Sequence, residues 1–287
     1  MEPAATLYRP PFERHSLLIP VTNGCSWGRC AFCSMYQDQP FSPVPKSQIK
    51  ERLKEAADYL PDTRRVFLGG GDPLCLPFEQ LEELLLDIRR ALPACREVAM
   101  YASLKNILPK TDEQLERLRQ LGLADLYIGV ESGCDPVLER MNKGHTAQMA
   151  LEQLTRLNRA GIPFFSILIY GLGGAGWGER NARDTARLLS QVRSKAIVMM
   201  NLTVFPGTQL EKMCREGSFV EASPLERIQE LACLLEELQV SEPTGFSTSH
   251  ITNQVVATGV LPQDRETLLA GLRAILNGEK PVNQIIL

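Results

Sequence analysis

Short apolar runs alternate with segments of helical periodicity six times along this chain of 287 residues. The apolar runs, which are rich in residues that favour strands, are Leu17–Thr22, Arg65–Leu68, Val98–Tyr101, Leu126–Val130, Phe164–Tyr170 and Ile197–Val204. The helical segments that follow them are Lys46–Leu60, Phe78–Leu92, Asp112–Leu121, Ala147–Ala160, Arg180–Val192 and Leu225–Leu238. Parallel strands need such crossover helices. The pattern therefore predicts an α/β fold with a parallel sheet, either an open doubly wound sheet or a barrel or partial barrel.

The residues at the predicted helix boundaries agree with this pattern. Pro224 stands in the first turn of one helix, and Thr111 can cap another. Gly122 and Gly161 stand where two helices stop. Proline is favoured at helix starts and glycine just after helix ends, so the boundaries and the periodicity point to the same elements.

No long linker or low-complexity stretch divides the chain, so we expect one core over residues 17–240. Residues 241–287 begin with a stretch rich in Ser and Thr and contain a last predicted helix at Asp264–Leu276. We expect this segment to form a short C-terminal cap.

Composition excludes several classes of protein. The chain has 31 Lys and Arg against 34 Asp and Glu, a net charge of −3, so it offers no overall basic surface and we expect no nucleic-acid partner. No apolar run reaches the ~18 residues that a membrane span requires, and the N-terminus lacks the apolar run of a signal peptide. We therefore expect a cytoplasmic protein with no membrane partner, whose eight cysteines stay reduced.

Three of the cysteines, Cys25, Cys30 and Cys33, stand within nine residues directly after the first predicted strand. Three thiolates this close can hold three corners of one metal centre, and the nearby glycines let the loop fold back. A [4Fe–4S] cluster with three protein ligands keeps one iron open to bind something else. The alternatives are a structural zinc site, which would need a fourth ligand such as His15, and three unrelated buried cysteines.

The cysteine segment resembles the cluster motif of the radical S-adenosylmethionine (SAM) superfamily. The usual motif is Cys-x3-Cys-x2-Cys with an aromatic residue before the last cysteine, which Phe32 matches; here the first gap is four residues instead of three. Further matching segments extend the resemblance over roughly residues 17–219. They are Gly69–Pro73, Gly129–Gly133, Leu138–Gly144, Ile167–Gly174 and Asn201–Thr208.

The resemblance implies a partial (β/α)6 barrel of the TIM type that binds a [4Fe–4S] cluster and SAM. Cys25, Cys30 and Cys33 would ligate the cluster. Arg140 would bind the SAM carboxylate, because a guanidinium group fits a carboxylate in bidentate fashion. The residues expected to contact SAM or to line its site are Phe32, Gly70, Gly71, Asp72, Ser103, Glu131, Arg140, Ile169, Gly171 and Asn201.

Several of these residues lie at the ends of predicted strands, or just after them. They are Cys25, Asp72, Ser103, Glu131, Gly171 and Asn201. In a parallel α/β sheet or barrel the carboxyl ends of the strands share one face, which is where active sites lie. The positions alone therefore predict a common site, whichever family the chain belongs to.

The implied reaction is the reductive cleavage of SAM, which leaves a 5′-deoxyadenosyl radical that abstracts a hydrogen atom from a small or medium-sized organic substrate. It requires a one-electron donor such as flavodoxin or ferredoxin. Two alternatives stay open. One is a non-catalytic iron–sulfur or haem-handling protein on the same fold, and the other is a zinc-stabilised barrel of unrelated activity.

Three further residues are candidates for catalysis. Cys75 and Cys134 closely follow predicted SAM-contacting segments, and a thiol there could donate a hydrogen atom to a substrate radical. The alternative for both is a small buried residue that packs under a loop. His250, in the segment rich in Ser and Thr, could act as an acid, a base or a substrate ligand, or have no role.

Overall fold

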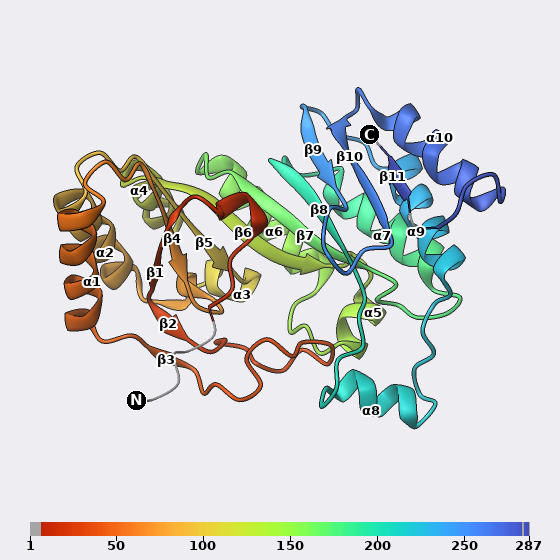
Figure 1. The fold of residues 1–287 in the computed structure, drawn as a ribbon, viewed down its shortest axis with the longest axis horizontal. Coiled ribbons are helices and arrows are strands. Elements are labelled where there is room, and N and C mark those ends of the chain that lie inside the picture. The colour runs from red at the N-terminus through yellow and green to blue at the C-terminus, as the bar shows by residue number, and fades with distance from the viewer. Residues whose placement is uncertain (1–6, 283, 287) are drawn as a thin grey trace. The chain divides into compact units, whose positions relative to one another are not determined.

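The computed structural model describes residues 7–282 and 284–286 (Figure 1). The chain forms two compact units. Unit 1 contains residues up to 28, 35–128 and 156–163, and unit 2 contains residues 29–34, 129–155 and 164 onwards. Strand β6 (Leu123–Glu131) begins in unit 1 and ends in unit 2. Helix α6 (Ala147–Arg159) begins in unit 2 and ends in unit 1.

Unit 1 is a layer of parallel strands covered by helices, with strand order β1-β4-β5-β6. Helix α1 packs against α2, and α2 packs against α4 (Figure 1). A short antiparallel pair, β2 with β3, follows β1. The elements are η1 (Pro11–Glu13), β1 (Leu17–Pro20), β2 (Thr22–Asn23), β3 (Ser42–Pro43), α1 (Lys46–Tyr59), β4 (Arg65–Gly69), η2 (Pro73–Cys75), α2 (Phe78–Ala91), β5 (Glu97–Ala102), α3 (Leu104–Ile107) and α4 (Asp112–Gln120).

Unit 2 has the strand order β7-β8-β9-β10-β11. Strands β7, β8 and β9 are parallel, β10 runs antiparallel to β9, and β11 is parallel to β10. Helix α7 packs against α9, and α9 against α10 (Figure 1). The elements are α5 (Asp135–Arg140), β7 (Phe164–Tyr170), α7 (Gly178–Leu189), β8 (Ala196–Asn201), α8 (Gln209–Arg215), α9 (Pro224–Glu237), β9 (Thr244–Ser247), β10 (Val255–Leu261), α10 (Arg265–Leu276) and β11 (Gln284–Ile286).

Every strand run and helix predicted from periodicity is present, with boundaries that differ by a few residues. The first run is split at Val21, and the sixth ends at Asn201 rather than at Val204. Thr111 caps α4 in a capping box with Gln114. The pattern missed the short helices α3, α5 and α8 and the strands β9 to β11, which extend the strand order beyond β8. The domain boundary at residue 240 stays a prediction.

No helix in the described part of the chain is both long and apolar enough to cross a membrane.

A buried ionic cluster ties the amino ends of the unit 1 strands together. Arg65, the first residue of β4, donates to Glu13 Oε2 at 2.9 Å and to Asp125 Oδ2 at 2.7 Å. Tyr127 Oη donates to Glu13 Oε1 at 2.7 Å. Burial raises the pKa of Glu13, but the hydrogen bonds from Arg65, Ser16 and Tyr127 together lower it below the ordinary value of 4.5. The cluster is therefore a stabilising element at the strand ends opposite the predicted site.

We expect Arg65→Met to lower the free energy of unfolding by about 3–5 kcal/mol, because it leaves the buried carboxylates of Glu13 and Asp125 without their cation. Urea unfolding at neutral pH measures this loss. The control is Arg117→Met, which removes an ion pair to Glu82 from a side chain that is 45% exposed and should cost about 1 kcal/mol or less. Equal losses in the two variants would contradict the role given to Arg65.

A second buried polar chain joins α7, α9 and the turn after β7 in unit 2. Ser132 Oγ donates to Asn181 Oδ1. Asn181 Nδ2 donates to Glu230 Oε1 at 2.7 Å, and the Gly171 N–H donates to Glu230 Oε2 at 2.8 Å. Burial raises the pKa of Glu230 to about 7, although the hydrogen bonds and the charge of Arg227 lower it in part.

The Glu230 carboxyl predicts a pH dependence of stability with a definite sign. Its pKa is about 7 in the folded chain and ordinarily 4.5, so the folded state binds more protons than the unfolded state between these pH values. The free energy of unfolding therefore falls as the pH rises from 4.5 to 7, by up to about 1.4 kcal/mol per pH unit. In Glu230→Gln this slope should be smaller, as urea unfolding at pH 5, 6 and 7 would show. The control is Glu236→Gln, whose side chain is 43% exposed. Parallel curves for Glu230→Gln and wild type would refute the assignment.

Candidate functional site

In unit 1 the glycine run after β4 packs directly against the first cysteine. The Gly71 N–H donates to the Gly24 carbonyl at 2.9 Å. A Cβ on Gly71 would lie 2.7 Å from Cys25 Cα, and a Cβ on Gly70 would collide with Thr22. Real side chains cannot approach so closely, so only glycine fits. The sequence predicts these glycines for a close approach to SAM; the structure shows that they also allow a close approach to the cysteine loop.

Asp72 follows this glycine run and is buried, with 1% of its surface exposed. It accepts hydrogen bonds from Ser26 Oγ at 3.0 Å, from the Ser103 N–H at 3.2 Å and from Asn106 Nδ2. Burial raises the pKa of Asp72, and these donors lower it in part. Two predicted SAM-contacting residues, Asp72 and Ser103, are therefore neighbours at the carboxyl ends of β4 and β5. The Ser103 N–H and the Asp72 carboxylate form the hydrogen bond between them.

Cys75, a candidate hydrogen donor, ends the short turn η2 and is half-buried. Burial and, to a smaller extent, the charge of the neighbouring Asp72 raise the pKa of its thiol to about 12. The sulfur therefore keeps its proton at neutral pH. Its role in catalysis stays a prediction.

In unit 2 the segment 29–34 carries Cys30 and Cys33, and main-chain hydrogen bonds fix it. The Ala31 N–H donates to the Met141 carbonyl at 2.9 Å, and the Leu210 N–H donates to the Ala31 carbonyl at 2.8 Å. Asn142 Nδ2 donates to the Arg29 carbonyl at 3.0 Å. The segment therefore rests on the end of α5 and the start of α8.

Asn142, which bonds to the cysteine segment, is a residue that sequence reasoning did not single out, although it lies in the matched segment Leu138–Gly144. Its φ is +49°, a left-handed conformation that asparagine tolerates better than most residues. That conformation ends the turn after α5. The sequence signal that could have found it is an asparagine, a residue that favours turns, just after a short helix.

None of the eight cysteines is in a disulfide, and Cys25, Cys30 and Cys33 are each partly exposed to solvent. By contrast, Cys95, Cys134 and Cys233 are buried. Partly exposed thiols in a reduced state are the donor set that an iron–sulfur cluster takes, so the chemistry of the three residues fits the group. Within the described residues no three His, Cys, Asp or Glu side chains already form a group that could hold a metal ion, and the ligand set stays a prediction.

Glu131 ends β6 in a left-handed conformation, with φ of +63°. Its Oε1 lies 2.9 Å from Lys143 Nζ, and both side chains are largely buried. A Cβ on Gly129 would collide with the Glu131 carboxylate, so the glycine makes room for this ion pair. A non-glycine residue in this conformation costs about 1–2 kcal/mol. Such strain at the end of a strand is typical of a residue held for function.

Arg140 and Ile169 have contacts within unit 2 that the sequence did not predict. Arg140 Nη1 donates to the Gly173 carbonyl at 3.2 Å, and its guanidinium lies 4.9 Å from the centre of the Trp177 ring. Ile169 belongs to a buried apolar cluster, against which Phe32 also packs. The expected SAM contacts of Arg140, Ile169 and Phe32 stay predictions.

Cys134 lies in the same apolar cluster and is fully buried. Burial raises the pKa of its thiol. This position favours the packing role that the sequence left open as the alternative to hydrogen donation.

Asn201, at the end of β8, is held by the loop between β9 and β10. Its N–H donates to Asn253 Oδ1 at 2.6 Å, and its Oδ1 accepts from Arg227 Nη1 at 2.7 Å. In that loop His250 Nδ1 lies 2.8 Å from Thr252 Oγ1, and burial lowers the pKa of the imidazole. His250 is therefore placed near the carboxyl end of β8, on a loop anchored through Asn253. Arg227 is a second residue that sequence reasoning missed.

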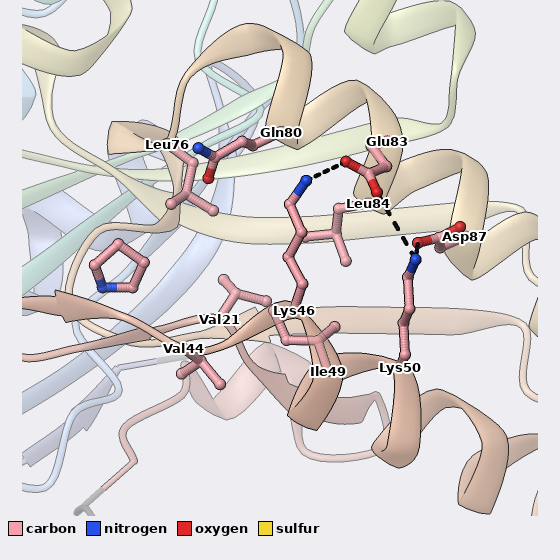
Figure 2. A pocket seen from close by; sticks show the side chains of 11 residues that line it. Val21, Val44, Lys46, Ile49, Lys50, Leu76, Gln80, Glu83, Leu84 and Asp87 are labelled. Atoms are coloured by element: carbon pink, nitrogen blue, oxygen red, sulfur yellow. Dashed lines mark hydrogen bonds and ion pairs between the residues drawn. The ribbon is translucent and has the colours of Figure 1, made fainter.

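Hollows in the described part of the chain lie apart from these groups. A small one of about 40 Å³ in unit 1 is lined by Val21, by Pro43 and Val44, and by side chains of α1 and α2 (Figure 2). Figure 2 shows Lys46 and Lys50 of α1 reaching Glu83 and Asp87 of α2 across it. This volume suits water rather than an organic substrate. An open groove between the starts of α7 and α9 in unit 2 is lined by charged side chains of both signs.

Comparison with known proteins places these features in a family. The model of the radical SAM superfamily matches residues 19–189, which is more than half of the chain. The haem chaperone HemW of Bacillus subtilis is 28% identical over 151 residues, covering 50% of this chain and 40% of that protein. The tRNA-2-methylthio-N(6)-dimethylallyladenosine synthase of Chlorobium luteolum is 27% identical over 238 residues, covering 78% of this chain and 50% of that protein. The chain thus spans half or less of the length of these relatives.

Solved structures share the fold. The oxidase HemN of Escherichia coli, a radical SAM enzyme, has a TM-score of 0.56 at 16% identity, covering 77% of this chain and 52% of that chain. Methylornithine synthase (PylB) has a TM-score of 0.54 at 15% identity, covering 94% and 70%. The methyltransferase TsrM of Kitasatospora setae, solved with cobalamin and a [4Fe–4S] cluster bound, has a TM-score of 0.57 at 15% identity, covering 73% and 41%.

These likenesses confirm the predicted α/β class of the partial-barrel type. Members of the matched superfamily bind a [4Fe–4S] cluster and SAM, the cofactor pair that the sequence predicts. The chain belongs to the radical SAM superfamily.

Proposed function

We propose that this chain is a radical SAM enzyme whose cluster is ligated by Cys25, Cys30 and Cys33. When bound, a reduced [4Fe–4S] cluster supplies the electron that splits SAM into methionine and a 5′-deoxyadenosyl radical, which takes a hydrogen atom from a small or medium-sized organic substrate. The observation that carries the proposal is the way the family motifs support the cysteines. Gly71 packs against Cys25, and Asn142 bonds to the segment that holds the other two cysteines.

The remaining motif residues would bind SAM at the carboxyl ends of the strands. Glu131 supplies a carboxylate held by Lys143 at 2.9 Å, placed to accept hydrogen bonds from hydroxyl or ammonium groups. Gly171 is glycine at φ of +81°, and a Cβ there would lie 3.1 Å from Arg227 Nε. The full set proposed to bind SAM is Phe32, Gly70, Gly71, Asp72, Ser103, Glu131, Arg140, Ile169, Gly171 and Asn201.

The substrate would be met by residues that the SAM motifs do not use. His250 is the proposed substrate ligand, because its loop is fixed to the end of β8 through Asn253. Cys75 keeps its proton and is the better placed of the two candidate hydrogen donors, since Cys134 is fully buried. We propose a flavodoxin or ferredoxin as the one-electron donor and the cytoplasm as the location.

A haem-handling role without SAM cleavage is the second candidate, since one relative named above is a haem chaperone. The two candidates differ in one product. An enzyme of the proposed class forms 5′-deoxyadenosine when reduced with SAM, whereas a haem-handling protein would bind iron and haem without forming it. Iron rather than zinc in the reconstituted chain would set aside a zinc-stabilised barrel.

We expect Cys30→Ala to abolish both the brown chromophore and SAM cleavage, because two thiolates cannot hold three irons of the cluster. The protein is reconstituted anaerobically with iron and sulfide and reduced with dithionite. Iron content and 5′-deoxyadenosine are then measured by colorimetry and mass spectrometry. The matched control is Cys214→Ala, which removes another partly exposed thiol and should retain at least half of both signals. SAM cleavage by Cys30→Ala at the wild-type rate would refute the cluster assignment.

We expect Glu131→Gln to weaken SAM binding about tenfold, or about 1.4 kcal/mol, with unchanged iron content, because the carboxylate is lost while the cysteines stay in place. Glu131→Gly should weaken SAM binding as much but relieve the strain at φ of +63°, which favours folding by about 1 kcal/mol. Calorimetric titration and urea unfolding measure the two effects. The control is Glu139→Gln, an exposed carboxylate on α5. Loss of iron from the Glu131 variants would instead assign the residue a structural role.

A further inference from the structure

The spacing of four residues between Cys25 and Cys30 is one longer than the usual motif, and two of the four residues, Ser26 and Trp27, contact other side chains of unit 1. Ser26 Oγ donates to Asp72 Oδ2 at 3.0 Å and accepts from Asn106 Nδ2 at 2.9 Å. Asn106 Nδ2 also donates to Asp72 Oδ2. The three side chains therefore form a closed triangle of hydrogen bonds.

The next residue of the loop has a second contact with the same short helix. Lys105 Nζ lies 3.3 Å from the centre of the Trp27 ring, a distance at which an ammonium group is attracted to the indole face. Lys105 and Asn106 are adjacent in α3, so one turn of helix holds two consecutive residues of the loop. All of these residues belong to unit 1.

We propose that Asp72, Lys105 and Asn106 form a clamp that positions Cys25 to ligate the cluster. The inference rests on the proposed function and assigns to Asp72 a role beyond SAM binding. The carboxylate is a positioning group that acts on Cys25 through Ser26. The clamp is the device by which this chain accommodates a first gap of four residues.

Burial fixes the Asp72 corner of the clamp, whereas Ser26 is exposed to solvent. Asp72 is 1% exposed, and a third donor, the Ser103 N–H, holds its other oxygen at 3.2 Å. A buried carboxylate that loses a donor is left with a large desolvation cost, so its partners are strongly fixed. Behind Cys25, a side chain on Gly71 has no room. The main chain of Gly71 packs against Cys25, and the clamp holds the next residue, Ser26, which lowers the entropy that cluster binding must overcome.

The test uses a pair of variants that exchange the two polar groups. In Asp72→Asn two amides face each other, and in Asn106→Asp two carboxyl groups do. Each single variant therefore loses a hydrogen bond. The double variant Asp72→Asn with Asn106→Asp restores a donor opposite an acceptor. Ser26→Ala is a milder variant that removes only the hydroxyl. Ser34→Ala, next to Cys33 and outside the clamp, is the matched control.

The first readout is the rate of alkylation of Cys25 in the reduced apoprotein, which needs no cluster. Trypsin cleavage after Arg14 and Arg29 gives a peptide in which Cys25 is the only cysteine, so mass spectrometry follows it alone. We expect the single variants and Ser26→Ala to raise this rate at least fivefold, the double variant to return it to within twofold of wild type, and Ser34→Ala to leave it unchanged. The peptide 91–96, which carries the buried Cys95, reports whether a variant has lost its overall fold.

The second readout is the iron bound per chain after anaerobic reconstitution. We expect it to fall by at least half in the single variants and to recover in the double variant. An unchanged alkylation rate in Asp72→Asn, or a double variant as reactive as the singles, would overturn the clamp. Restored alkylation without restored iron would overturn the role in cluster binding. Wild-type protein that binds no iron would refute the proposed function, and the alkylation series would still decide whether the clamp exists.

Discussion

The candidate site depends on a close approach of two main-chain segments, at Gly71 and Cys25. The Gly71 N–H donates a hydrogen bond to the Gly24 carbonyl, with 2.9 Å between the nitrogen and the oxygen. Any side chain on Gly71 would force the two segments apart. The glycine run belongs to the end of β4, a strand buried in the core of unit 1. The end of a rigid strand therefore fixes the position of the first cysteine, although the cysteine itself lies in a loop. Loops carry chemistry best when a rigid scaffold places them in this way.

Buried carboxylates at the two ends of the unit 1 strands have different hydrogen-bond partners. At the amino ends, Arg65 donates hydrogen bonds to the buried carboxylates of Glu13 and Asp125. At the carboxyl ends, a buried carboxylate meets neutral donors instead of a cation, as Asp72 shows. The division matches the general separation of stability and function between the two ends of parallel strands.

Periodicity predicted most of the fold, and with it the strand ends at which the candidate site residues lie. Strands such as Phe164–Tyr170 are continuous apolar runs, and residues such as Glu131 and Asn201 lie where those runs end. The pattern could not reveal contacts between distant segments. The bond from Asn142 to Arg29 joins residues 113 positions apart, and that from Asn106 to Asp72 joins residues 34 apart. Strand β9 has 4 residues and β11 has 3, and a glycine interrupts the apolar run of β10. Such sequences acquire strand geometry by pairing with neighbours, which the pattern does not reveal.

The main-chain bonds of Ala31 have a consequence for redox chemistry. Ala31 lies between two of the proposed ligands, Cys30 and Cys33, and its N–H donates to the Met141 carbonyl. This amide would therefore not donate a hydrogen bond to a cluster sulfur. Hydrogen bonds to sulfur stabilise the extra negative charge of a reduced cluster and raise its reduction potential. A cluster held by these cysteines would therefore lack this one donor, which would act to lower its reduction potential. A low potential is what the one-electron cleavage of a sulfonium ion demands.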